Sequence, residues 1–189
     1  MRAASARRGA VDGMAGDGRP AGARRLLGID LGARRIGVAI GDTLTGVAAP
    51  LSTLSRSRSF EADARAIGRL AAEHSVDGLI VGLPLDMSGE EGHQAAITRE
   101  WATAVGPAVG LPLRFRDERL TSERAEERIG TPQRGRSGGP PTAAQRQARR
   151  ARIDREAAAL ILQDELDAMA TGATAPSYPD GPDLDRPER

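Results

Sequence analysis

Two apolar stretches near the start of the chain decide its fold: Leu26–Gly32 (LLGIDLG) and Arg35–Asp42 (RIGVAIGD). In both, large apolar residues alternate with small or polar ones, which is the period-two pattern of a β-strand. The two residues between the stretches predict a tight turn. Asp30 lies inside the first strand, where a polar group without a partner costs on the order of 2–7 kcal/mol. Its carboxylate therefore needs compensation, and a metal ion is the candidate that we consider first.

The glycines next to Asp30 bear on the same question. Gly28 and Gly32 share the face of Asp30 in the alternating pattern, and we expect them to leave space beside its carboxylate. The alternative without a function is a polar group satisfied within the core or a turn residue at the end of a strand, and the space left by Gly28 and Gly32 favours the functional interpretation.

The remaining pattern predicts one α/β domain with a mixed sheet flanked by helices. The run Leu79–Pro84 is apolar without alternation, as in a strand buried on both faces of a parallel layer. Pro112 lies within another short alternating run, which favours an edge strand there. Strands are expected over about 46–54, 79–84 and 111–116, and helices over about 60–74, 92–105, 121–129 and 148–170.

The ends of the chain and one internal segment lack periodicity. We expect disordered tails over residues 1–24 and 171–189, and a domain over 25–170. Met14 is an alternative start of the protein. Residues from about 131 to 148 are rich in Gly, Pro and Arg, which predicts a mobile loop before the last helix.

Composition excludes several classes of function. The chain has 189 residues, no Cys and two His, so it contains no disulfide, thiolate zinc site or Cys nucleophile. No apolar run reaches the ~20 residues of a membrane span, and no secretory signal is evident, so we expect a cytoplasmic protein. All 27 basic residues are Arg, which binds phosphate bidentately. Aromatic residues make up only 2%, so nucleic acid would be bound through Arg–phosphate contacts rather than base stacking.

Two further places carry acidic side chains of interest. Asp117 continues the face of Leu111, Leu113 and Phe115, whereas Glu118 continues the face of Arg114 and Arg116. Alternation alone does not choose between the two, and an acidic pair before a helix N-terminus is equally plausible. Asp154 stands at the beginning of the strongest helical pattern, where it is either a helix N-cap or a functional carboxylate.

Together these carboxylates suggest an all-oxygen site built by a first strand, a later strand and the last helix. Such ligands, without Cys and with few His, favour Mg²⁺ or Mn²⁺. A pair of these ions about 4 Å apart activates water and stabilises the leaving oxygen in phosphodiester hydrolysis.

As a set, these motifs resemble the YqgF/RuvX family over about residues 25–168. The resemblance is carried by Gly28–Gly32 with Arg35–Ala39, by Val81–Pro84 with Gly89 and Gly92, by Asp117–Ser122, and by Ile153-Asp154 with Ala157-Ala158 and Ile161–Gln163. The family contains Holliday-junction-resolvase-like proteins assigned to processing the 5′ end of pre-16S rRNA.

The resemblance implies an RNase H-like fold, a five-stranded sheet in the order 3-2-1-4-5 with strand 2 antiparallel to its neighbours. It implies a cytoplasmic, metal-dependent nuclease in ribosome biogenesis, with Asp30, Glu118 and Asp154 as the catalytic and metal-binding residues. Arg35 matches a basic position of the family, and we expect Arg35, Arg119 and Arg152 to contact nucleic acid. Structured RNA, and pre-16S rRNA in particular, is the expected partner, with possible ribosomal association.

Three alternatives stay open. A glycine-flanked Asp strand followed by a basic turn also resembles the phosphate-binding hairpin of actin-like and sugar-kinase ATPases, although those proteins close nucleotide between two such domains. A non-catalytic RNA-binding module of the same fold is the second. The third is a nuclease that acts on branched DNA, which favours a homodimer over a monomer because symmetric cleavage needs two sites.

Overall fold

The computed structural model describes residues 19–20, 22–86, 88–118, 121–130 and 140–172, with the backbone alone for 121–123. A single sheet has the strand order β3-β2-β1-β4-β5. Strand β2 is antiparallel to β1 and β3, while β1, β4 and β5 run parallel to one another. The strands are β1 (Arg25–Leu31), β2 (Arg35–Asp42), β3 (Val47–Ser55), β4 (Gly78–Leu83) and β5 (Leu113–Asp117). This order and these directions confirm the predicted RNase H-like sheet.

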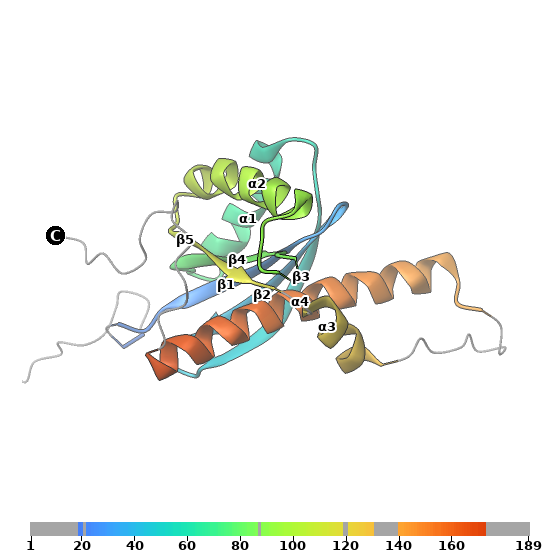
Figure 1. Ribbon diagram of the computed structural model, residues 1–189. Coiled ribbons are helices and arrows are strands. Elements are labelled where there is room, and N and C mark those ends of the chain that lie inside the picture. Colours follow the sequence, from blue (N-terminus) through green and yellow to red (C-terminus); the bar gives the residue numbers. More distant parts are fainter. Residues whose placement is uncertain (1–18, 21, 87, 119–120, 131–139, 173–189) are drawn as a thin grey trace, which may run out of the picture.

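Helices cover both faces of the sheet (Figure 1). Helices α1 (Phe60–Glu73) and α2 (His93–Val109) lie on one face, and α4 (Ala143–Thr171) crosses the other. The short helix α3 (Thr121–Ile129) packs beside α4. Within the part of the chain that the structure describes, no helix is long and apolar enough to cross a membrane.

Side-chain alternation in β1 divides the core into two layers. Leu27, Ile29 and Leu31 are buried in the larger layer, which α1 and α2 complete. The other face of the sheet carries glycines, and there α4 approaches the strands closely. A Cβ atom at Gly28 would lie 2.6 Å from the carbonyl oxygen of Ala158 in α4. Small residues on this face therefore let a helix pack directly on the backbone of β1 and β2.

Helix α4 begins earlier than the sequence pattern suggested. It starts at Ala143, not near 148, so residues 143–148 are helical and do not belong to the expected loop. The cause is a capping box: Gln145 N–H donates to the Thr142 hydroxyl, and the Gln145 side chain accepts from Thr142 N–H at 2.7 Å. Residues 131–139 of the expected loop lie outside the described residues.

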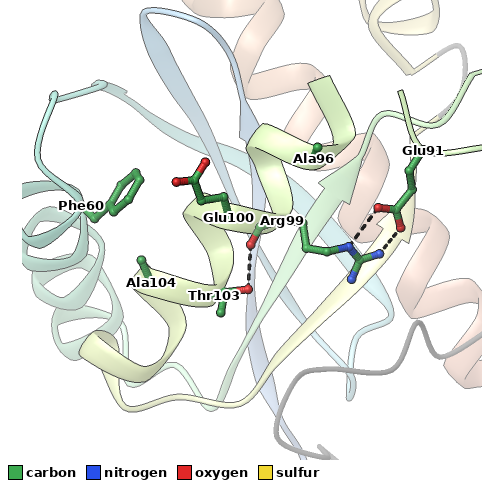
Figure 2. Close-up of a pocket in the computed structure, with 7 residues that line it drawn as sticks. All are labelled: Phe60, Glu91, Ala96, Arg99, Glu100, Thr103 and Ala104. Carbon is green, nitrogen blue, oxygen red and sulfur yellow. Dashed lines mark hydrogen bonds and ion pairs between the residues drawn. The ribbon is translucent and has the colours of Figure 1, made fainter. Parts of the chain in front are cut away.

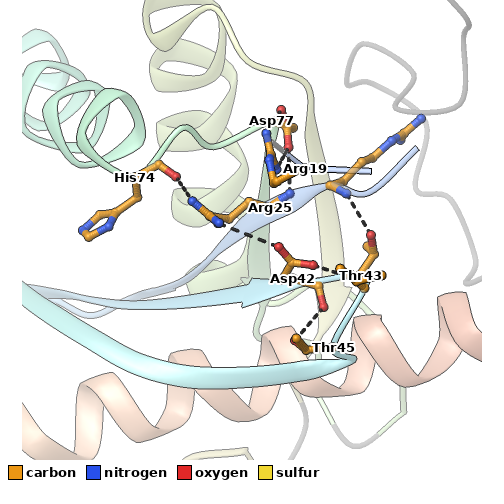
Figure 3. Close-up of polar contacts among 9 residues, drawn as sticks. Arg19, Arg25, Asp42, Thr43, Thr45, His74 and Asp77 are labelled. Atoms are coloured by element: carbon orange, nitrogen blue, oxygen red, sulfur yellow. Dashed lines mark hydrogen bonds and ion pairs between the residues drawn. The ribbon is translucent and has the colours of Figure 1, made fainter. Parts of the chain in front are cut away.

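The chain before β1 is partly attached to the domain, contrary to the prediction of a disordered tail up to residue 24. Arg19 donates to Asp77 at 2.6 Å, and Arg24 N–H donates to the Thr43 hydroxyl at 2.8 Å (Figure 3). Asp77 also accepts from Arg25 N–H at 2.7 Å, so one carboxylate joins this segment to the start of β1. Residues 1–18 and 173–189 lie outside the described part, and α4 ends at Thr171 with Gly172 as its cap.

Candidate carboxylate site

Asp30 lies near the end of β1, on the face that α4 covers. Its neighbours on both adjacent strands are glycines. Gly37 of β2 pairs directly with Asp30. On the other side Ile29 pairs with Val81, and the parallel register continued by one residue brings Gly82 beside Asp30. Because neither neighbour has a side chain, the sheet leaves room on both sides of the Asp30 carboxylate for groups from other elements.

Glu118 fills the space on one side. It follows the last residue of β5, and its N–H donates to the carbonyl of Leu83 at 3.2 Å, which extends the pairing with β4. A Cβ atom at Gly82 would lie 2.1 Å from Glu118 Oε2, so the carboxylate rests directly on that glycine. Alternation therefore holds to the end of β5: Arg114 and Arg116 contact Glu165 of α4, and Glu118 follows on the same face. The family resemblance had selected Glu118 over Asp117, and Glu118 is the one that lies on the face of Asp30.

Asp154 approaches from the other side, on α4. A Cβ atom at Gly37 would lie only 2.0 Å from the Asp154 carbonyl oxygen, so the helix backbone touches the sheet at this point. One turn earlier, the Thr53 hydroxyl of β3 donates to the Ala151 carbonyl at 2.7 Å and fixes the same part of the helix. Asp154 lies well inside α4, which begins at Ala143, so the N-cap interpretation is wrong.

The side chain of Asp154 is hydrogen-bonded to Arg35 at the start of β2. Arg35 Nε donates to Asp154 Oδ2, and Nη2 lies 3.4 Å from Oδ1. Both side chains are partly exposed, at 27% for Arg35 and 19% for Asp154, so the pair is accessible from solvent. The hydrogen bond to Asp154 is also the largest cause that raises the pKa of Arg35. Arg35 thus acts as the internal counterion of the site.

Protonation of the other two carboxylates is strongly altered. Burial, together with the nearby charge of Asp154, raises the pKa of Asp30 to about 7, although Arg35 opposes the shift. Burial, and then the charges of Asp30 and Asp117, raise the pKa of Glu118 to about 8. These mutual effects link Asp30 electrostatically to Glu118 on one side and to Asp154 on the other. Carboxylates held close enough to repel one another can share a proton or bind a hard cation.

The three side chains do not yet form a closed ligand set. Among the described residues, no group of three acidic, His or Cys side chains is arranged to hold a metal ion. The pairing of Asp154 with Arg35 explains why the three carboxylates do not form such a group, because the Asp154 carboxylate points to the Arg35 guanidinium and not to a point shared with Asp30 and Glu118. The structure therefore brings Asp30 and Glu118 to one place and leaves Asp154 beside them with a competing partner.

The glycines that matter differ from those expected. The space beside Gly28 is filled by α4, since a Cβ there would also lie 2.7 Å from Leu162 Cβ. Gly37 and Gly82, which belong to the neighbouring strands, make the room around Asp30 instead. An isolated glycine inside a strand often marks the close approach of another group. Gly82 within an otherwise apolar strand carried that signal in the sequence.

The predicted nucleic-acid contacts have different outcomes. Arg35 lies in the site, as described. Arg152 is exposed on α4, two residues before Asp154. Arg119 lies outside the described residues. All three stay predictions as contacts to nucleic acid.

Two other features lie apart from this cluster. Glu165 is buried, and its carboxylate lies 3.5 Å from Arg114 and 3.3 Å from Arg116, an arrangement that joins α4 to β5. A shallow hollow of about 490 Å³ lies over α2, next to Phe60 and the ion pair between Glu91 and Arg99 (Figure 2). It belongs to the helical layer on the opposite face of the sheet from the carboxylates.

Comparison with known proteins agrees with this arrangement. A family model described as "RuvX: Holliday junction resolvase" matches residues 24–168. A relative from Chloroflexus aggregans, named "Putative pre-16S rRNA nuclease", is 43% identical over 76% of this chain and 93% of its own length. A relative of the same name from Synechococcus elongatus is 45% identical over 75% of this chain and 87% of its own.

Similarity to solved structures is lower. RuvC from Thermus thermophilus, in complex with a Holliday junction substrate, has a TM-score of 0.46 at 15% identity and covers 79% of this chain and 97% of its own. A likeness of this size carries no argument about function. The family model and the relatives, which cover most of the chain, place it in the RuvX family.

Proposed function

We propose that this protein is a metal-dependent nuclease that hydrolyses phosphodiester bonds in structured RNA, and that its substrate is the 5′ region of pre-16S rRNA. The observation that carries the proposal is the cluster around Asp30, in which three carboxylates from β1, the end of β5 and α4 approach one another. The names of the relatives support the choice of RNA. Maturation of pre-16S rRNA would place the protein in the cytoplasm.

The donor set fits a hard divalent cation, Mg²⁺ or Mn²⁺. Every candidate ligand is a carboxylate, which is the preferred ligand type of these ions. Burial, and then repulsion from neighbouring carboxylates, raises the pKa of Asp30 and of Glu118, and a bound cation would compensate the negative charge that makes ionisation costly there. Asp30 and Glu118 would bind the cation first, and Asp154 would join them on release from Arg35. When bound, the cation supplies charge neutralisation and a more acidic water.

The side chains themselves have separable roles in this proposal. Asp30 and Glu118 hold the centre from rigid strands, which limits its movement. Asp154 completes it from α4. Arg35, at the exposed edge, is positioned to exchange its carboxylate partner for a phosphate of the substrate, which an Arg guanidinium binds equally well.

The test compares wild type with Asp30→Asn on labelled precursor rRNA and on a four-way junction DNA, each with Mg²⁺, Mn²⁺ or EDTA. Asp164→Asn is the matched control, because it makes the same change at a partly exposed position of α4, where Asp164 pairs with Arg124 at 3.1 Å. We expect metal-dependent cleavage of the RNA by wild type and Asp164→Asn, and a loss of at least about 100-fold in Asp30→Asn.

Three results would contradict the proposal. Cleavage by Asp30→Asn at the wild-type rate would refute the site. Binding of RNA without cleavage, unchanged by EDTA, would favour a non-catalytic RNA-binding module. Cleavage of the junction DNA and not of the RNA would favour the resolvase activity that the family description names.

A further inference from the structure

The N-terminal part of α4, residues 143–152, extends past the edge of the sheet, where Figure 1 shows the orange end of the helix projecting beyond the strands. We call this segment the arginine arm. Its residues are exposed apart from Arg149 and Ala151, which are partly buried. Ala151 accepts the hydrogen bond from Thr53, and Arg149 donates to the Gly130 carbonyl at 3.0 Å. The rest of the arm faces solvent.

The positive charge of the arm is unfavourable for the stability of the helix that carries it. It carries Arg146, Arg149, Arg150 and Arg152 and no acidic residue. Cations near a helix N-terminus are unfavourable because the macrodipole is positive there. Like charges spaced three or four residues apart also repel one another. The last turn has no basic residue either, so nothing in α4 offsets the dipole at its C-terminal end. A pattern that costs helix stability in this way indicates a function that needs the charge.

The arm leads away from the candidate site along one side of the helix. Asp154, Arg150 and Arg146 follow one another at intervals of four residues, so their side chains lie on neighbouring turns of the same side. At 1.5 Å per residue, Arg146 lies roughly 12 Å along the helix axis from Asp154. Over the sheet this side of α4 is buried, but on the arm both arginines are exposed. The arm therefore presents two exposed arginines, Arg146 and Arg150, in line with Asp154 along α4.

We propose that the arginine arm binds the phosphate backbone of a double-helical segment of nucleic acid that flanks the bond presented to the carboxylate site. A straight helix with charges along one side is suited to a stiff, regularly charged backbone, and guanidinium groups bind phosphate bidentately. The low aromatic content of 2% leaves little capacity for stacking the bases of a single strand. This inference rests on the proposed nuclease function and assigns the part of the substrate that lies outside the cleaved bond.

The test measures binding, without cleavage, of a labelled RNA hairpin in EDTA over a range of salt concentrations. The variant is Arg146→Gln/Arg150→Gln. The control is Arg65→Gln/Arg69→Gln, which removes the same charge from two exposed positions of α1 on the opposite face of the sheet. We expect the arm variant to bind about tenfold more weakly and the slope of log affinity against log salt to decrease by about 2. The control should retain affinity and slope within about twofold.

Thermal unfolding separates this role from a structural one. Arg146 donates to the Pro141 carbonyl, so a structural role predicts a lower Tm for the arm variant. A phosphate-binding role predicts a Tm that is unchanged or higher, because charge unfavourable to the helix has been removed. Affinity and salt slope equal to wild type, or an equal decrease in the control, would overturn the inference.

The outcomes also distinguish this inference from the proposed function. If wild type cleaves no substrate but the arm variant binds the RNA hairpin more weakly, the phosphate-binding role of the arm is supported and the nuclease function is contradicted. Metal-dependent cleavage with no effect of the arm variant on binding supports the nuclease and contradicts the arm.

Discussion

The Arg35 guanidinium donates hydrogen bonds to both carboxylate oxygens of Asp154, so both oxygens already have a positively charged partner. The backbone of Asp154 packs closely on the sheet, because a Cβ atom at Gly37 would lie 2.0 Å from its carbonyl oxygen, and the Thr53 hydroxyl donates to the Ala151 carbonyl one turn earlier. We therefore expect any change of partner to come from rotation of the two side chains. Under the proposed function, a cation and the guanidinium would compete for the Asp154 carboxylate, and a substrate phosphate would favour the cation by attracting Arg35.

This competition predicts that Arg35→Gln binds Mn²⁺ several-fold more tightly than wild type in the absence of nucleic acid, because Asp154 loses a charged partner. Isothermal titration calorimetry measures the affinity. Arg34→Gln, at the adjacent exposed position, is the matched control and should behave as wild type. Weaker Mn²⁺ binding by Arg35→Gln would instead mean that Arg35 holds Asp154 in the metal-binding orientation.

The raised pKa values predict an unusual dependence of stability on pH in EDTA. The pKa of Asp30 is about 7 in the folded protein, against an ordinary value of 3.8. Between pH 3.8 and pH 7 the folded state therefore binds more protons than the unfolded state. Stability must then fall as pH rises through this window, and the pKa of Glu118, near 8, extends the fall. We expect urea unfolding to give a lower free energy of unfolding at pH 8 than at pH 5.5.

The same linkage makes Asp30→Asn a stabilising substitution at alkaline pH. The amide keeps the shape of the side chain and cannot ionise, so the variant should be more stable than wild type at pH 8 and close to it at pH 5. Urea unfolding at the two pH values measures the difference, and Asp164→Asn serves as the control at a partly exposed site. Equal stability of Asp30→Asn and wild type at pH 8 would mean that Asp30 is ionised at no cost in the folded protein.

Contact between Gly82 and Glu118 predicts that Gly82→Ala lowers both the stability of the protein and its rate of cleavage. A Cβ atom at this position would lie 2.1 Å from Glu118 Oε2 and 2.5 Å from Ile161 Cδ1, so both side chains must shift. Overpacking of this kind costs typically 1–3 kcal/mol. Displacement of the carboxylate should reduce the rate of cleavage at least about tenfold, which amounts to about 1.4 kcal/mol in the barrier.

Gly68→Ala in α1 is the matched control for that substitution. No atom lies within 4 Å of a Cβ built there, so the change should stabilise the helix by about 0.5–1 kcal/mol and leave cleavage unchanged. Chemical denaturation and initial rates of cleavage measure both variants. If Gly82→Ala retained full activity, cleavage would not require the Glu118 carboxylate at its observed position.

Metal binding should reverse the effect of pH. Because carboxylates bind a cation in their ionised form, Mn²⁺ must displace protons from Asp30 and Glu118 below their pKa values of about 7 and about 8. We expect Mn²⁺ to raise the Tm more at pH 8 than at pH 6, and the rate of cleavage to increase over the same range. Differential scanning fluorimetry with and without EDTA measures the shift in Tm. A shift that is larger at pH 6 would contradict the assignment of these ligands.

The sequence alone was sufficient for most of the architecture. Alternation in Leu26–Gly32 and Arg35–Asp42 predicted the central strands, the unbroken apolar run up to Pro84 predicted a buried parallel strand, and Pro112 indicated the edge of the sheet. These signals are local, because each residue's periodicity reports which side of its own element is buried. Order and direction of the strands came from the family resemblance. The start of α4 was misplaced because its cap, Thr142, lies within a Gly- and Pro-rich stretch that resembles a loop.

What only the tertiary structure decided is how the carboxylates meet. Alternation left the choice between Asp117 and Glu118 open, and it could not identify Gly82 of another strand as the surface against which the Glu118 side chain rests. Nor could it pair Asp154 with Arg35, which is 119 residues away in the sequence. Each of these relationships depends on strand register and on the close approach of α4 to the sheet. Such distances are set by the packing of whole elements, and residue types along the chain do not encode them locally.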